Sequence, residues 1–133
     1  MTPIEQELTT ALIGAIQCEN DQAVATYNLP ETFEGFNGHF PGHPILPAVL
    51  QIMLGKLVCS EFSATPLSVV SIGRAKFMQE IAPNMDIQVQ AVQKAITEGN
   101  ERRFSITVLT NDTKASTFSM TCKEASQIGR AHV

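Results

Sequence analysis

The 133-residue sequence predicts an α+β fold in which a curved antiparallel sheet wraps round one long buried helix. The helix is predicted from residues 48–62, "AVLQIMLGKLVCSEF", an almost unbroken apolar run that follows Pro47 and is too long for a strand. The sheet is predicted from the later segments, which alternate apolar and polar residues as strands with one buried face do. A single helix and a single sheet can bury each other's apolar faces, provided that the sheet curls round the helix.

The elements before the long helix are shorter. Residues 3 to about 17 place apolar side chains at helical spacing, and Thr2 and Glu5 form the pattern of a capping box, so a short first helix is expected there. Residues 23–29 alternate loosely and predict a strand. Residues 31–47 contain several glycines and prolines, which predicts a loop.

After the long helix, the sequence predicts a meander of four strands, with turns at 82–84, 97–100 and 111–112. The inward positions of two of them are clear: Ile87, Val89 and Ala91 share one face, and Phe104, Ile106 and Val108 share another. Residues 126–133 show no pattern and are expected to be a frayed tail of a single domain spanning residues 1–133. This arrangement of one helix and one curled sheet is the hot-dog fold.

The composition excludes several classes. A net charge of -4 argues against nucleic acid as a main partner, because phosphate binding needs a basic face. The three cysteines, Cys18, Cys59 and Cys122, are far apart and show no disulfide pattern, which indicates a reducing, cytoplasmic location. The start of the chain lacks the basic region of a secretory signal, and no apolar run is long enough for a membrane span.

The stretch "GHFPGHPILPAVLQI", residues 38–52, combines a histidine with the expected start of the long helix. A helix start presents unpaired amides and a partial positive charge, so the amides of Ala48, Val49 and Leu50 would stabilise an oxygen that gains negative charge. His39 could then take a proton from carbon next to a thioester carbonyl held there. The alternative is that His39 is an ordinary loop residue. His39 and His43 lack a third ligand, so no metal site is expected.

The same stretch resembles the signature of the β-hydroxyacyl-acyl-carrier-protein dehydratases, a hot-dog family. "RAKFMQEIAPNMDIQV", residues 74–89, is similar to a second strand and turn of that family. The short first helix and lead-in strand are closer to the small dehydratase-like proteins of aryl polyene pathways than to the fatty acid enzymes. The resemblance implies a dimer whose two sheets run on as one. It also implies loss of water from a 3-hydroxyacyl group on acyl carrier protein, with no cofactor.

The resemblance also assigns roles to residues. The family's catalytic histidine falls on His39, and the amide that binds the thioester carbonyl falls on Ala48, with Gly42 and Pro44 holding the loop. The predicted substrate channel contains Phe40, Met53, Leu54, Leu57 and Met78. The acidic carrier protein is expected to dock on basic residues, for which the candidates are Arg74, Lys76, Arg102, Arg103 and Lys123.

One departure from the family's pattern affects the proton donor. Fourteen residues after its histidine the family has a Glu or Asp on the helix, and this chain has Met53, which cannot donate a proton. Three interpretations stay open: a slow dehydratase helped by Gln51 or a water, a subunit that pairs with an acid-bearing homologue, or a protein that only binds acyl chains or carrier protein. A hot-dog thioesterase is a further alternative. By default, a methionine on an apolar helix fills the core or an interface, and this role of Met53 is compatible with all three interpretations.

Overall fold

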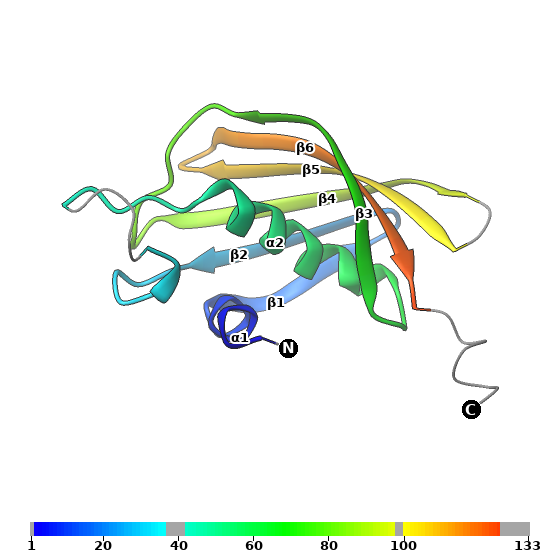
Figure 1. Cartoon of the computed structure of the whole chain (residues 1–133), viewed down its shortest axis with the longest axis horizontal. Helices are drawn as coiled ribbons and strands as arrows, with labels where there is room; N and C mark the ends of the chain where they lie inside the picture. The colour runs from blue at the N-terminus through cyan, green and yellow to red at the C-terminus, as the bar shows by residue number, and fades with distance from the viewer. Residues whose placement is uncertain (1, 37–41, 98–99, 126–133) are drawn as a thin grey trace.

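The computed structural model describes residues 2–36, 42–97 and 100–125. Its strands form one six-stranded sheet in the order β1-β2-β4-β5-β6-β3, and every neighbouring pair is antiparallel. The helix α2 lies across one face of this curved sheet (Figure 1). The predicted α+β hot-dog arrangement is therefore confirmed, while His39, Phe40 and the tail at 126–133 lie outside the described residues.

The helix α1, Pro3–Thr10, is shorter than predicted. Its start is as expected, because the Thr2 hydroxyl accepts a hydrogen bond from the Glu5 amide and the Glu5 carboxylate completes the capping box. The prediction of a helix to residue 17 is wrong, since β1, Leu12–Glu19, follows directly. Strand β1 pairs with β2, Gln22–Asn28, and Gly14 at φ +72° lies in its bulge. Pairing with an available sheet edge outweighs a helical spacing of apolar residues.

The helix α2, Ala48–Cys59, begins and ends close to the predicted bounds, and the short 3-10 helix η2, Ser60–Phe62, continues it. Its inward residues, including Leu50, Leu54 and Val58, are buried against the sheet. Gly55 allows close approach: a Cβ there would lie 3.0 Å from the Phe118 ring and 3.3 Å from Ile106. The 3-10 helix η1, Glu34–Phe36, closes one end of the core.

The remaining strands are β3, Leu67–Phe77, β4, Asp86–Thr97, β5, Glu101–Thr110, and β6, Thr113–Glu124. The predicted inward faces of β4 and β5 are buried. The predicted four-strand meander is wrong in one respect, because only β4, β5 and β6 follow one another in the sheet. Strand β3 pairs with β6 at the far edge, so the 78–85 connection carries the chain from that edge to the interior position of β4. The alternation of apolar and polar residues shows which face of a strand is buried, but it does not show which strand pairs with it.

No helix in the described part of the chain is long and apolar enough to cross a membrane.

Candidate active site at the start of the long helix

The start of α2 has backbone amides that no side chain caps. Pro47 is its N-cap, at φ -62° and ψ 152°, and no side chain caps the helix. The Pro47 carbonyl accepts from the amides of Leu50 and Gln51, at 3.0 and 3.2 Å. Ala48 and Val49 occupy the first two helical positions and are exposed. The helix start can therefore stabilise a partial negative charge on an approaching oxygen.

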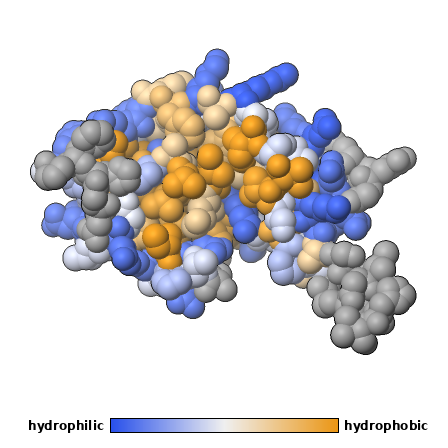
Figure 2. Space-filling model, in the orientation of Figure 1, coloured by the Kyte–Doolittle hydropathy of each residue, from blue (hydrophilic) through white to orange (hydrophobic). Residues whose placement is uncertain are grey.

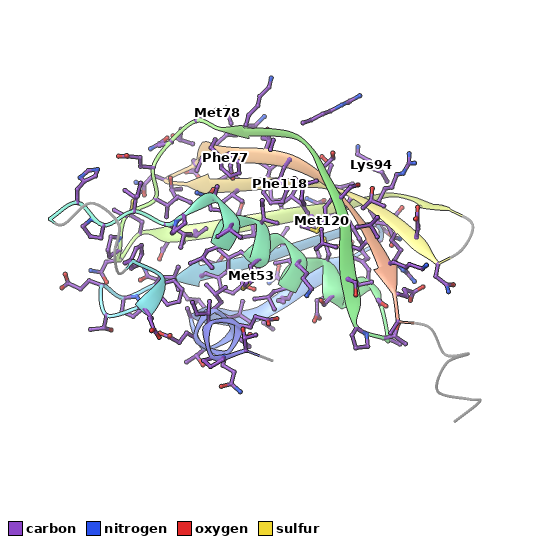
Figure 3. All side chains as sticks on the ribbon, in the orientation of Figure 1. Met53, Phe77, Met78, Lys94, Phe118 and Met120 are labelled. Carbon is purple, nitrogen blue, oxygen red and sulfur yellow. The ribbon has the colours of Figure 1, made fainter. Side chains whose placement is uncertain are left out.

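A pocket of about 380 Å³ lies beside this helix start. The helix contributes Ala48 and Gln51, and the end of β3 with its following connection contributes Phe77, Met78 and Glu80. The two sides are tied together, because the Leu46 amide donates a 2.8 Å hydrogen bond to the Ile81 carbonyl. Phe77 is also fixed from behind by stacking on Phe118 of β6, with ring centroids 6.5 Å apart; Figure 3 shows the two rings next to each other.

Gln51 brings an unusual polar group to this pocket. Its side chain is almost completely buried, at 4% exposure. Its Nε2 donates to the Leu46 carbonyl at 3.2 Å, while its Oε1 has no partner among the described residues. A buried acceptor without a donor costs free energy, and a ligand that carries a hydroxyl or amide N–H can remove that cost.

Glu80 and His43 form a second polar feature at the pocket. The Oε1 of Glu80 lies 2.9 Å from the Nε2 of His43, and both side chains are largely exposed. No catalytic or binding role was predicted from the sequence for either residue. The two are far apart in the sequence, so the alternation and turn patterns contain no signal for their contact.

The residues predicted to form the site are distributed as follows. Gly42 has φ +82°, a conformation that favours glycine. Met53 and Leu57 are half-buried on α2, and Met78 lies at the pocket. Leu54 is fully buried, so within this chain it belongs to the core. Figure 3 shows Met53 and Met78 on their separate elements.

Three of the five predicted docking residues line one groove on the sheet. The groove measures about 820 Å³, and Arg74, Lys76, Lys94 and Arg103 surround it. Its lining includes hydroxyl side chains and no acidic residue from the described part of the chain. Arg102 lies elsewhere, donating to Gln93 at 2.7 Å and to Glu124 at 3.4 Å. Lys123 is exposed but does not line the groove.

Lys94 lines this groove but was not among the docking residues predicted from the sequence. The alternation of β4 provides the signal that could have found it, because Lys94 falls on the same polar side as Gln88 and Gln90.

Two buried cysteines and one buried tyrosine are unsuited to catalysis near neutral pH. Burial raises the pKa of the Cys59 thiol, and burial raises that of Cys122 to about 11. Burial, with a smaller contribution from Glu61, raises the pKa of Tyr27 to about 12. Among residues 2–36, 42–97 and 100–125, no group of three or more acidic, histidine or cysteine side chains could hold a metal ion.

An apolar surface surrounds the site. Figure 2 shows a hydrophobic band across the face that carries α2 and β3. The most exposed large apolar side chains of α2, β3 and the connection after β3 are Val49, at 63%, and Val70 and Met78, both at 53%. Strand β3 is also an edge of the sheet, with one side unpaired in this chain. An apolar face next to an open strand edge is typical of a surface that a partner covers.

Comparison with known proteins gives a family match. The family model for ApeI-like proteins, described as ApeI dehydratase, matches residues 15–122. The 3-hydroxyacyl-[acyl-carrier-protein] dehydratase FabZ of Fusobacterium nucleatum is 33% identical over 86 residues, which cover 58% of this chain and 61% of that protein. FabZ of Enterococcus faecalis is 34% identical over 71 residues, covering 48% and 49%. The chain thus spans about half to three fifths of the length of these curated relatives.

A solved structure gives the same fold. It is the dehydratase heterocomplex ApeI:P from Xenorhabdus doucetiae, matched with a TM-score of 0.67 and 24% identity over 85% of this chain and 96% of that chain. The likeness supports the hot-dog fold, and the family model supports the resemblance seen in the sequence. Because the family model extends over most of the sequence, the chain belongs to the ApeI-like dehydratase family.

Proposed function

We propose that this protein removes water from 3-hydroxyacyl thioesters on acyl carrier protein and yields trans-2-enoyl thioesters. The observation that carries the proposal is the uncapped start of α2, which opens into a pocket beside the end of β3. The curated relatives named above are dehydratases of such substrates. The short α1 and the lead-in strand β1 favour an aryl polyene pathway over fatty acid synthesis.

The helix start has the chemistry that this reaction needs. A thioester carbonyl that accepts from the Ala48 amide becomes more polarised, which makes the proton on the adjacent carbon more acidic. His39, which stands nine residues before Ala48 in the sequence, is the proposed base for that proton. Met53, Leu57 and Met78 would contact the acyl chain, with Phe40 beside His39.

We further propose that the active form is a dimer joined along β3. The unpaired edge of β3 and the apolar residues beside it would be covered by a second subunit. In a homodimer the partner is a second copy of this chain. In the alternative, a heterodimer, an acid-bearing homologue supplies the carboxylate that is missing at position 53, and the solved relative described above is a dehydratase heterocomplex.

The carrier protein would dock on the basic groove. Arg74, Lys76, Lys94 and Arg103 place positive charge around one depression of an otherwise acidic protein, and acyl carrier protein is acidic. Lys76 lines the groove, and the next residue, Phe77, lines the pocket and ends β3. Because neighbouring residues of a strand point to opposite faces of the sheet, the groove and the pocket lie on opposite faces near the end of β3.

The purified protein should convert a 3-hydroxyacyl thioester to its enoyl product, followed by the absorbance of the conjugated thioester or by mass. His39→Ala should abolish the reaction, and a thiol assay on acyl thioesters without a hydroxyl should stay negative. Activity that appears only after mixing with an acid-bearing homologue would support the heterodimer. Thiol release without dehydration would identify a thioesterase and refute the proposal.

A further inference from the structure

The long helix offers no carboxylic acid to protonate a leaving hydroxyl. Between Ala48 and Cys59 it contains no acidic residue, and the Met53 thioether cannot donate a proton. Loss of water from a 3-hydroxyacyl group still needs a proton for the departing oxygen, and a missing general acid costs about 10²- to 10⁴-fold in rate. The acid that the structure does bring to the pocket is Glu80, from the connection after β3.

The backbone that carries Glu80 is fixed on both sides. The amides of Met78 and Gln79 donate to the Ala115 carbonyl, at 2.8 and 3.2 Å. After Glu80, the carbonyl of the fully buried Ile81 accepts from the Leu46 amide at 2.8 Å. The Glu80 side chain therefore extends from an anchored segment, although its own tip is exposed.

His43 allows the Glu80 carboxylate to share a proton. Its Nε2 lies 2.9 Å from the Glu80 Oε1, so a single proton can be held in the hydrogen bond between imidazole and carboxylate. Both side chains are more than half exposed, at 66% for His43 and 62% for Glu80, so the pair can regain a proton from water after each turnover.

We infer that the Glu80–His43 pair is the proton donor for the leaving hydroxyl and replaces the acid that α2 lacks. This inference rests on the proposed function. The base removes a proton from C2, the electron pair of that C–H bond forms the C2=C3 double bond, and the C3–O bond breaks. The departing oxygen takes the proton held between Glu80 and His43 and leaves as water. The pair is left as carboxylate and neutral imidazole, and the base returns its proton to solvent.

Gln51 completes the arrangement. Gln51 lines the same pocket, and its Oε1, which has no partner among the described residues, is the acceptor that we propose for the substrate hydroxyl. That bond uses the hydroxyl hydrogen and leaves the lone pairs of the oxygen for the proton from Glu80. The pocket thus offers an acceptor and a donor for the same oxygen.

The first test is the rate of dehydration by the purified protein without any homologue. Glu80→Gln should lower kcat about 10²-fold or more and change KM little, and His43→Asn should lower kcat in the same direction. Glu80→Ala should regain activity when formate is added. Glu19→Gln, which changes an exposed glutamate on β1, is the matched control and should keep the wild-type kcat. Because Glu80 is largely exposed, its variants should keep the wild-type melting temperature.

A second-site variant tests the same inference without relying on one substitution. Met53→Glu introduced into Glu80→Gln should restore kcat, since it returns an acid to the helix. Wild-type activity in Glu80→Gln would overturn the inference and leave the proposed function intact. A wild-type protein that works only with an acid-bearing homologue would also overturn it, because the partner then supplies the proton. A wild-type protein that dehydrates nothing in either assay would refute both.

Discussion

The amide of Leu46 donates a 2.8 Å hydrogen bond to the carbonyl of Ile81, and this bond joins the two walls of the candidate site. On one side it fixes the segment that leads into α2, whose first helical residue is Ala48. On the other it fixes the connection that carries Glu80. The Leu46 carbonyl also accepts from Gln51, so a single residue of the loop holds the helix start and the connection in place.

Met53→Glu should raise the rate of dehydration in the wild-type background. The position is half-buried on α2, one turn beyond the helix start, where a carboxyl group can act as a second proton donor. The gain should reach up to about 10²-fold, because general acid catalysis contributes in this range. The matched control is Leu57→Glu, which places a carboxyl on the same helix face one turn further on. An equal gain from both variants, or from neither, would contradict the role of proton donor that the family resemblance assigns to position 53.

Much of the fold could be predicted from the sequence, because its signals are local. The apolar run after Pro47 indicated α2, and alternation assigned the inward residues of β4 and β5. The end of α1 and the neighbour of β3 could not be predicted in this way. Each depends on which strand edge is available in the folded sheet, and that is a property of the whole chain.

The candidate site also contains features that local sequence predicts and contacts that it does not predict. The uncapped helix start at Ala48 and the loop glycine Gly42 follow from nearby residues, so both could be predicted. The contact between His43 and Glu80 joins residues 37 positions apart in the sequence, and it depends on the crossing of the 78–85 connection. For Lys94, alternation predicts only the polar face of β4, and its place in the basic groove with Arg74 and Lys76 depends on the strand order of the folded sheet.

Charge reversal in the basic groove should weaken the use of carrier-bound substrate. Lys94→Glu and Arg103→Glu should each raise KM for the carrier-bound substrate roughly tenfold at low salt, and added salt should shrink the effect. KM for a small thioester without carrier protein should stay unchanged. Lys114→Glu reverses an exposed charge that does not line the groove, so it serves as the control. A tenfold effect on both substrates would place these residues in catalysis instead of docking.

Glu124 should stabilise the fold near neutral pH, and this contribution should be lost in acid. The pKa of its carboxyl is lowered chiefly by the Ser63 hydroxyl, which donates at 2.8 Å, and also by Arg102. A carboxyl whose pKa is lower in the folded state stabilises the protein above its unfolded pKa, and this contribution disappears as the pH falls through the folded pKa. The melting temperature of the wild type should therefore fall more between about pH 6 and pH 3 than that of Glu124→Gln. Glu19→Gln should follow the wild-type curve, and parallel curves for Glu124→Gln would contradict the assignment.

The dimer should depend on one edge of the sheet and not on the other. Val70 and Ile13 are both exposed, at 53% and 50%, and they lie on the two edge strands, β3 and β1. If subunits pair along β3, Val70→Glu places a charge in the interface and should shift the protein towards the monomer, because charges block pairing of strand edges. Ile13→Glu adds the same charge at the opposite edge and should leave the mass unchanged. Light scattering or native mass spectrometry measures both, and loss of the dimer in Ile13→Glu alone would place the interface on β1 and refute pairing along β3.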